Sequence, residues 1–265
     1  MSFNKILLTT AFAACGISIA NAQEKTKPED TEVYTPVPKV VQAKGVFTPP
    51  PSDAVVLFDG KDLSKWVTTD NRDEPAKWTI GNGVFTVNKK TGGGNIETKQ
   101  SFLNYQLHIE WQVPANVKGK GQGRGNSGLF LASIGKGDAG YELQILDSYQ
   151  NDTYTNGQAG SIYKQLVPLA NPTNKPGEWN SYDVIWTAPT FNDDKSVKTP
   201  AKVTVLFNGV LVQDNAVLKG PTQYIGDPAY REAHGASPIK LQSHGDPSEP
   251  LSFRNIWVRE LPAVN

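Results

Sequence analysis

Cysteine is almost absent from this sequence: among 265 residues the only one is Cys15, which lies in the first apolar run. Disulfides therefore cannot hold the fold together, and a hydrophobic core must do so. About 210 residues remain after the N-terminal segments, and a chain of that size buries about 70% of its surface. Histidine is scarce as well, and His108, His234 and His244 lack the close spacing of a zinc site.

An excess of charge is also missing, because Lys plus Arg and Asp plus Glu both total 26. A balanced surface produces no long-range field that would attract nucleic acid or an anionic membrane. The apolar run over residues 6–15 is too short to span a bilayer. We therefore expect neither a nucleic-acid partner nor a membrane span.

The N-terminal segment has the pattern of a secretory signal peptide over residues 1–22. Lys5 precedes the apolar run, and the small-x-small triplet that ends at Ala22 predicts cleavage there. We therefore expect a periplasmic or secreted protein. The alternative is a lipoprotein signal processed at Cys15. Phe12 is unusual at the start of such a site, and the residues after the cysteine are apolar, unlike a solvated tether.

Two further segments follow the signal. Residues 23–51 are polar and rich in proline, which favours an extended lead because proline fits neither a helix interior nor a strand ladder. Residues 52–262 contain the apolar patterning, with no internal repeat and no second change in composition. We interpret residues 52–262 as one domain.

The domain has the patterning of β structure throughout. Apolar and polar residues alternate from 105 to 113, and His108 on the polar face of this segment is expected to be solvated. Asn82-Gly83 and Asn208-Gly209 each separate two apolar runs, as in a two-residue type I′ hairpin. Only residues 227–233 suit one or two helical turns. Many short strands, with 24 Gly and 19 Pro, predict an all-β sandwich or jelly roll.

The most informative segment runs from Tyr141 to Ser148. If it forms a strand, Glu142 and Gln144 share one face while the apolar residues between them share the other. A β-bulge at 145–146 would turn Asp147 onto the polar face. Glu142 and Asp147 would then be a carboxylate pair, which a cleft can divide into a protonated acid and an ionised base. The alternative is a solvated polar face, with Asp147 opening a turn.

Residues around this strand supply further candidates. The glycine-rich loop 119–125 carries Arg124, and Asn126 begins a strand that we expect to pair with the strand described above. The loop is either a mobile lid or an exposed hairpin loop. His244 ends a strand before a turn, a position suited to proton transfer, with a capped turn residue as the alternative. Tyr163 is either a surface for a sugar ring or part of the core.

Seven short motifs are spread along the domain in this order: FDGKDLSKW at 58–66, NSGLFL at 126–131, YELQILDS at 141–148, GEWN at 177–180, NGVLVQDN at 208–215, LQSHG at 241–245 and FRNIWVR at 253–259. As a set they resemble the 3-keto-disaccharide hydrolase domain family over residues 54–261, although no single motif is specific. The resemblance implies a concanavalin-like jelly-roll sandwich of two curved antiparallel sheets. It also implies a secreted or periplasmic protein whose substrates are 3-keto-glycosides.

The resemblance also implies a mechanism, because the central strand departs from similar glycosidases. Laminarinase-type enzymes have an acid-x-Asp-x-x-Glu pattern, where this chain has Glu142-x-Gln144-x-x-Asp147. One carboxylate is thus an amide and another is one carbon shorter, which argues against a retaining mechanism. A keto group at C3 instead acidifies the hydrogen at C2. A base, an enolate stabiliser and an acid then suffice for elimination, after which water can add.

For that scheme we expect His244 or Glu142 as the base and Asp147 as the acid. Arg124 or a divalent cation would stabilise the enolate. Glu142, Asp147 and His244 are mixed oxygen and nitrogen donors that suit a divalent ion without specifying it. The substrate would be held by Arg124, Asn126, Gln144 and Tyr163.

Two other classes of function stay open at this point. A carbohydrate-binding module without catalysis has the same fold, and fold does not fix function. An ordinary glycoside hydrolase would act on an unoxidised glucan. Activity on a 3-keto sugar, but not on its unoxidised counterpart, separates the three.

Overall fold

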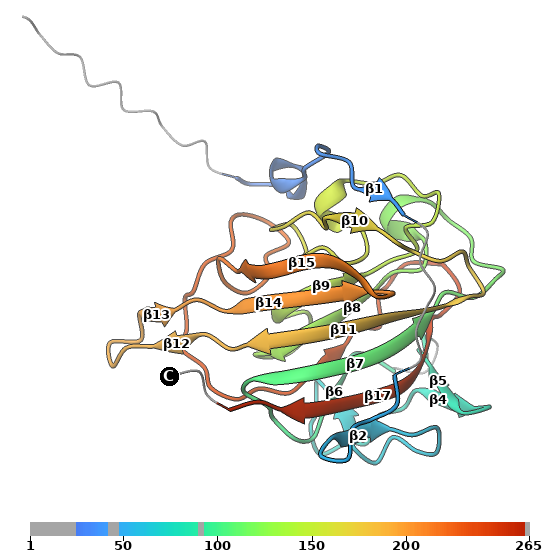
Figure 1. Ribbon diagram of the computed structural model, residues 1–265, viewed down its shortest axis with the longest axis horizontal. Coiled ribbons are helices and arrows are strands. Elements are labelled where there is room, and N and C mark those ends of the chain that lie inside the picture. Colours follow the sequence, from blue (N-terminus) through green and yellow to red (C-terminus); the bar gives the residue numbers. More distant parts are fainter. Residues whose placement is uncertain (1–24, 42–47, 90–92, 263–265) are drawn as a thin grey trace, which may run out of the picture.

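The computed structural model describes residues 25–41, 48–89 and 93–262, and these residues fold into two main antiparallel sheets (Figure 1). The all-β jelly-roll prediction is confirmed. The larger sheet has the strand order β15 (Val210–Val217), β14 (Lys202–Phe207), β11 (Trp179–Thr187), β7 (Tyr105–Gln112), β17 (Ser252–Glu260), β5 (Val84–Thr86) and β4 (Thr79–Gly81), with β2 (Val55–Phe58) also paired to β17. The smaller sheet has the order β3 (Trp66–Thr68), β6 (Ile96–Thr98), β16 (Lys240–Leu241), β8 (Ser127–Ser133) and β9 (Gly140–Ile145).

The remaining elements are short. A parallel pair joins β1 (Lys39–Val40) to β10 (Ala170–Asn171), and a small hairpin joins β12 (Thr190–Phe191) to β13 (Val197–Thr199). The described residues also form the single-turn 3-10 helices η1 (Pro28–Thr31), η2 (Gly121–Gly123) and η3 (Thr155–Gly157). No helix in the described ranges is long and apolar enough to cross a membrane.

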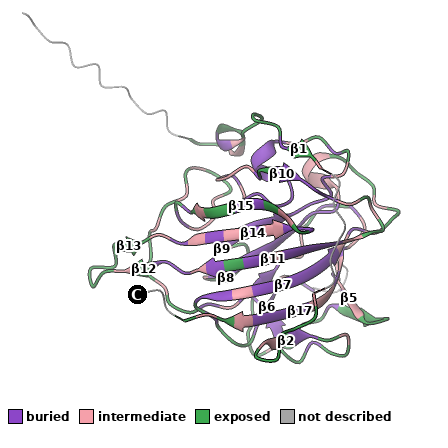
Figure 2. Cartoon of the chain, in the orientation of Figure 1, coloured by how far each residue is buried: buried purple, intermediate pink, exposed green. Residues whose placement is uncertain are grey.

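The core lies between the two sheets, where the alternating pattern of each strand places its apolar residues (Figure 2). Trp111 of β7 and Tyr182 of β11 are completely buried there. Burying an aromatic side chain of this size contributes about 3 kcal/mol. The Tyr182 hydroxyl also donates to the backbone carbonyl of Gln144 at 2.7 Å. This hydrogen bond anchors β9, the strand that carries the candidate site, to the larger sheet.

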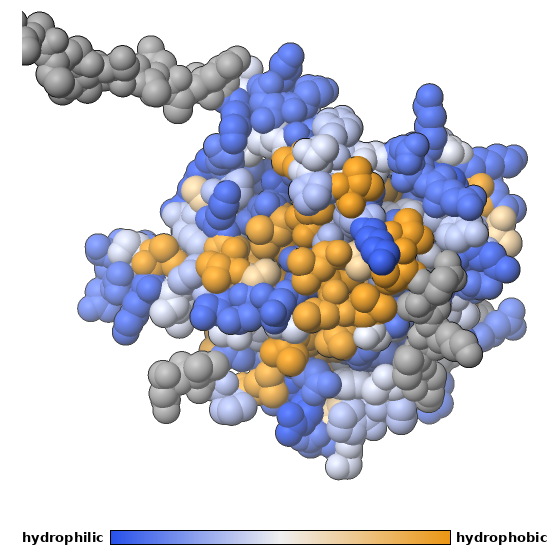
Figure 3. Space-filling view, turned by 45° about the horizontal axis from the view of Figure 1, so that its top comes forward, coloured by the Kyte–Doolittle hydropathy of each residue, from blue (hydrophilic) through white to orange (hydrophobic). Residues whose placement is uncertain are grey.

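Both predicted Asn-Gly hairpins are confirmed. Asn82-Gly83 connects β4 to β5, and Asn208-Gly209 connects β14 to β15. All four turn residues have positive φ angles, as a type I′ turn requires. On the outside of the larger sheet the alternation is less strict. Ile185 and Leu211 remain exposed there, and apolar side chains also gather on the face of the molecule shown in Figure 3.

Two local predictions were wrong. His108 is completely buried rather than solvated, because Trp257 of the C-terminal strand stacks on its ring. Its Nδ1 atom lies 2.7 Å from the Asp183 carboxylate. Residues 227–233 form no helix. Tyr230 from this segment is drawn onto the core, where its hydroxyl donates to the carbonyl of Leu218 at 2.9 Å. In both places a contact with a distant part of the chain determines the local structure.

The lead that precedes the domain packs against it over residues 25–41. β1 pairs with β10 beside the domain (Figure 1). The carbonyl of Val33 accepts from the N–H of Thr155, and its N–H donates to Asn156 Oδ1; both partners belong to η3. The predicted signal peptide and its cleavage site lie outside the described residues.

Candidate active site

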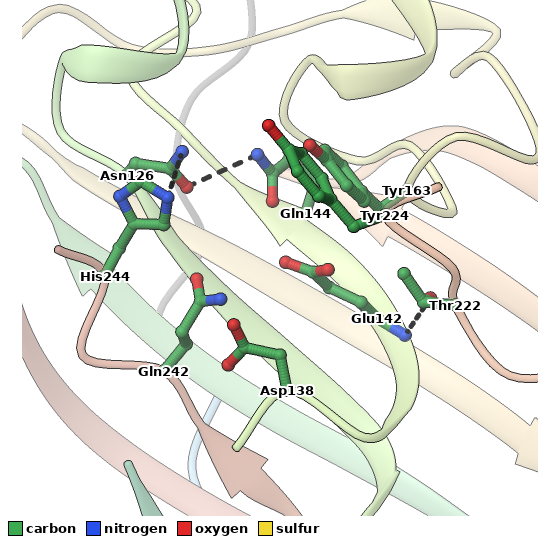
Figure 4. Close-up of a pocket in the computed structure, with 9 residues that line it drawn as sticks. All are labelled: Asn126, Asp138, Glu142, Gln144, Tyr163, Thr222, Tyr224, Gln242 and His244. Atoms are coloured by element: carbon green, nitrogen blue, oxygen red, sulfur yellow. Dashed lines mark hydrogen bonds between the residues drawn. The ribbon is translucent and has the colours of Figure 1, made fainter. Parts of the chain in front are cut away.

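A cavity of about 310 Å³ opens on the face of the smaller sheet that points away from the core (Figure 4). Strand β9 supplies the polar side chains of its floor, and loops from five other parts of the chain supply the walls. Figure 4 shows Glu142 and His244 on opposite sides of this cavity. The lining residues are Asn126, Asp138, Glu142, Gln144, Tyr163, Thr222, Tyr224, Gln242 and His244.

The strand geometry places Glu142 in the cavity, as its position in the alternating pattern predicts. Its backbone N–H donates to the Thr222 hydroxyl at 3.0 Å, and its carbonyl accepts from the N–H of Tyr163 at 3.1 Å. Gly128 of β8 leaves room for the carboxyl group, since a Cβ atom there would come within 2.5 Å of Glu142 Oε1. Thr222 and Tyr163 therefore hold the backbone at Glu142, and Gly128 leaves space for its side chain.

Glu142 is an acid that keeps its proton near neutral pH. Only 5% of its surface is exposed. Burial, helped by the negative charge of Asp138, raises the pKa of Glu142 to about 8, although the Lys240 ammonium opposes the shift. A carboxyl group in this state can donate a proton to a leaving group, the role that a raised pKa serves in general acid catalysis.

This pKa makes folding stability depend on pH. The folded protein holds the Glu142 proton up to about pH 8, while the unfolded chain releases it near 4.5. Between these values the folded state binds more protons, so the free energy of unfolding falls as the pH rises. We expect Glu142→Gln to be more stable than the wild type at about pH 9, by roughly 2–4 kcal/mol.

Urea unfolding at several pH values measures that difference. It should shrink towards zero at about pH 4, where both states of the wild type are protonated. The exposed Glu178, which pairs with Lys175, provides the control Glu178→Gln. If the two variants show the same flat pH response, Glu142 is ionised in the folded protein.

Gln144 lies next to Glu142 on the cavity floor, as predicted. In one amide orientation Gln144 Nε2 donates to Glu142 Oε1 at 3.1 Å and to the carbonyl of Ser127 at 3.2 Å. In the other orientation, drawn in Figure 4, Nε2 lies 3.4 Å from Asn126 Oδ1 and the oxygen faces Glu142. The first orientation suits an ionised Glu142 and the second a protonated one. Rotation of this amide can therefore accompany proton transfer by Glu142.

His244 stands across the cavity with a carboxylate partner that the sequence did not reveal. Its Nδ1 atom lies 3.2 Å from Asp246 Oδ2, and its Nε2 atom lies 3.4 Å from the amide nitrogen of Asn126. The backbone N–H of Asp246 also points at Nδ1, at 3.2 Å. When Nδ1 carries the proton and donates to Asp246 Oδ2, Nε2 is an acceptor at the cavity that also receives the Asn126 amide. This is the arrangement of a histidine base oriented by a carboxylate.

Asp246 is held in its charged form. Burial raises its pKa, but hydrogen bonds from His244, Ser248 and Lys89 outweigh burial and hold the pKa of Asp246 at about 2. The Lys89 ammonium lies 2.9 Å from Asp246 Oδ2. The charged Asp246 carboxylate therefore remains available as a hydrogen-bond acceptor for the His244 imidazole.

Asp147 and Arg124 lie apart from the other predicted site residues. Strand β9 keeps a regular register from Glu142 to Ile145 and ends there, so no bulge turns Asp147 towards the cavity. Asp147 is buried, and its Oδ2 atom pairs with Arg124 Nε at 2.7 Å. Neither residue lines the cavity. The structure therefore brings together Asn126, Glu142, Gln144, Tyr163 and His244 only.

Other lining residues were not identified from the sequence. Among the described residues the side-chain oxygen of Gln242, a lining residue, is buried without a hydrogen-bond partner, so this acceptor can receive a hydroxyl group of a ligand. Its place two residues before His244, in the segment that follows β16, was the available signal. Tyr224 and Thr222 reach the cavity from a loop that follows the edge of β9. Asp138 is held at the rim by Asn95, whose amide donates to its carboxylate at 2.9 Å.

The proposed metal donors do not converge. In the described ranges no three His, Cys, Asp or Glu side chains form a group that could hold a metal ion. Asp147 is occupied by Arg124, and Glu142 and His244 are on opposite sides of the cavity.

The jelly-roll sandwich with a polar cavity, together with the family match, supports a glycoside-acting enzyme. The chain belongs to the family described as the 3-keto-alpha-glucoside-1,2-lyase-like domain, which matches residues 53–259. This match confirms the resemblance seen in the sequence. No curated protein matches the chain.

Solved structures show the same fold. The crystal structure of an inferred glycosyl hydrolase from Parabacteroides distasonis ATCC 8503 is 51% identical, with a TM-score of 0.75, and the alignment covers 95% of this chain and 100% of that one. Two further structures from the same organism, also inferred glycosyl hydrolases, are 20% and 22% identical, each with a TM-score of 0.55. They cover 79% and 78% of this chain, and 94% and 99% of their own. At this identity the latter two show the fold alone.

Proposed function

We propose that the protein cleaves 3-keto-glycosides by 1,2-elimination in the cavity between His244 and Glu142. The observation that carries this proposal is the opposed pair itself. One side has an imidazole oriented by Asp246, and the other has a carboxyl group that burial keeps protonated. A proton acceptor and a proton donor across one cavity are what elimination across adjacent carbons requires.

The reaction begins at the carbon next to the ketone. His244 Nε2 removes the hydrogen from C2, and the electron pair of that bond forms the C2–C3 double bond of an enolate whose negative charge is on the C3 oxygen. The amide nitrogen of Gln242, a residue that lines the cavity, can donate to this oxygen. Donors that wait in place for a developing charge stabilise it without reorganising.

The second step releases the aglycone. The enolate electrons return to form the C1–C2 double bond, the C1–O bond breaks, and Glu142 gives its proton to the departing oxygen. The products are an unsaturated 3-keto sugar and an alcohol. Addition of water across the new double bond places hydroxyl at C1 and hydrogen at C2, which completes net hydrolysis. The family description supports elimination at C1 and C2.

A matched pair of substrates tests the proposal. We expect the purified protein to release methanol from methyl 3-keto-α-glucoside and to leave methyl α-glucoside intact, because only the ketone makes the C2 hydrogen acidic. Release is measured by product analysis over time. Equal cleavage of both compounds would show an ordinary glycosidase. Binding of either sugar without turnover would show a carbohydrate-binding module.

The N-terminal pattern supports a periplasmic or secreted location, which we include in the proposal. Sequencing of the mature N-terminus tests it, with Gln23 as the expected first residue. A lipid-modified Cys15 in a membrane fraction would contradict a freely soluble form.

A further inference from the structure

Lys164 is buried directly behind the aromatic wall of the cavity. Only 7% of its surface is exposed, and its ammonium lies 4.7 Å from the ring centre of Tyr224 and 5.9 Å from that of Tyr163. Both rings line the cavity. A third ring, that of Tyr154, lies 5.6 Å away, and its hydroxyl is 2.6 Å from the hydroxyl of Tyr163. The ammonium thus contacts every ring of this wall.

The two hydrogen-bond acceptors of this ammonium are backbone carbonyls from distant parts of the chain. Nζ donates to the carbonyl of Tyr224 at 3.0 Å and to the carbonyl of Pro28 at 2.8 Å. Burial lowers the pKa of Lys164, against the weaker pull of Glu32 and Glu29. Burying a cation without a directly bound carboxylate is costly, and a methionine would fill the space more cheaply. What lysine adds is a fixed link between two segments.

The backbone at Lys164 is also held in an unusual conformation. Its φ angle is +58°, a left-handed value that residues with a side chain rarely adopt. The N–H of Lys164 donates to the carbonyl of Asn156 at 2.8 Å, and the amide of Asn156 donates to the carbonyl of Thr31. The turn therefore directs the Lys164 side chain to Pro28 of the lead. The hydrogen bond from Asn156 to Thr31 holds the same part of the lead.

The lead lies outside the part of the chain that matches the family, since that match begins at residue 53. It nevertheless reaches the wall at two points. Pro28 is bound by Lys164, and the exposed ring of Tyr34 packs edge-on against Tyr154, with ring centres 6.4 Å apart. Tyr224, at the mouth of the cavity, is itself 63% exposed, and Lys164 packs against the back of its ring.

We propose that Lys164 is a positioning residue for substrate binding, and that the N-terminal lead is through it a built part of the substrate site. Lys164 donates to the carbonyls of both Pro28 and Tyr224. It thereby holds the rings of Tyr224 and Tyr163 in place as the surface on which the sugar ring stacks. This inference rests on the function proposed above. Lys164 touches neither acid nor base, so it acts on binding rather than on the chemical step.

The variants Lys164→Met and Lys164→Arg test this role in the full-length protein. With methyl 3-keto-α-glucoside we expect Lys164→Met to raise KM about five- to tenfold, as for loss of a charge-assisted hydrogen bond and ring contacts, while kcat changes less than about twofold. Lys164→Arg should restore most of the KM, since a guanidinium can donate to both carbonyls. The exposed Lys175, varied to Met, is the control and should leave KM unchanged.

Hydrogen exchange provides a readout that does not depend on the substrate. Residues 28–34 and 220–226 should lose protection together in Lys164→Met and regain it in Lys164→Arg. Unchanged exchange in either segment would overturn the link. A rise in KM for Tyr224→Leu, without one for Lys164→Met, would overturn the positioning role while leaving the proposed function intact. If the wild type fails to turn over any 3-keto-glucoside, the proposed function fails, and exchange alone decides whether Lys164 joins the lead to the wall.

Discussion

Replacing Glu142 by Gln is expected to lower turnover of a 3-keto-glucoside by about two to four orders of magnitude, the usual scale of general acid–base catalysis. Glutamine keeps the size of the side chain but has no proton to give to the leaving group. KM should change little, because Gln144, Tyr163 and Tyr224 still line the cavity. The loss should be larger for alkyl than for activated aryl glycosides, since only the former need a protonated leaving group.

Steady-state kinetics with both kinds of aglycone measure this loss. Glu178→Gln, the exposed control, should keep wild-type activity. Thermal unfolding must accompany the kinetics, although Glu142→Gln is expected to gain stability above neutral pH rather than lose it. Full activity in a folded Glu142→Gln variant would remove this residue from the chemistry.

Replacing His244 by Ala is expected to cost roughly two to three orders of magnitude in turnover, for a different reason. The variant lacks the base, so activated and unactivated glycosides should suffer equally. Asp246→Asn should lower turnover less, because the imidazole remains and loses only the carboxylate that orients it. His234, which lies outside the cavity against Tyr141, supplies the control His234→Ala. Equal activities of the His244 and His234 variants would contradict the assignment.

The parts of this fold that could be predicted depend on short-range rules. Strand β7 followed from the alternation of residues 105–113, and both hairpins followed from Asn-Gly pairs. The same period of two placed Glu142 and Gln144 in one cavity before any partner was known. Each of these rules acts within a few residues, so the sequence expresses it directly.

The parts that could not be predicted depend on contacts between distant segments. His108 reads as a polar strand residue, but Trp257 covers it. Asp246 reads as a turn residue, yet Lys89 and His244 make it the charged partner of a base. Asp147 was expected in the cavity on the assumption of a bulge. No local pattern shows that the Asp147 carboxylate instead pairs with Arg124, from the loop before β8.

The walls of the site illustrate the same limit. Thr222 and Tyr224 belong to a loop with no apolar period and no motif, and they reach Glu142 only because β9 is an edge strand whose free side must be covered. The lead was expected to be extended. Its role behind Tyr163 depends on Lys164, whose neighbours come from three separate parts of the chain.

Exchange of the C2 hydrogen with solvent tests the central claim most directly. Methyl 3-keto-α-glucoside is incubated in D₂O with the wild type, Glu142→Gln or His244→Ala, and deuterium at C2 is followed by NMR in substrate and product. We predict that Glu142→Gln exchanges C2 without releasing methanol, because its base is intact, and that His244→Ala does neither. Wild-type release of methanol with the C2 hydrogen fully retained in the sugar product would contradict elimination and with it the roles assigned to both residues.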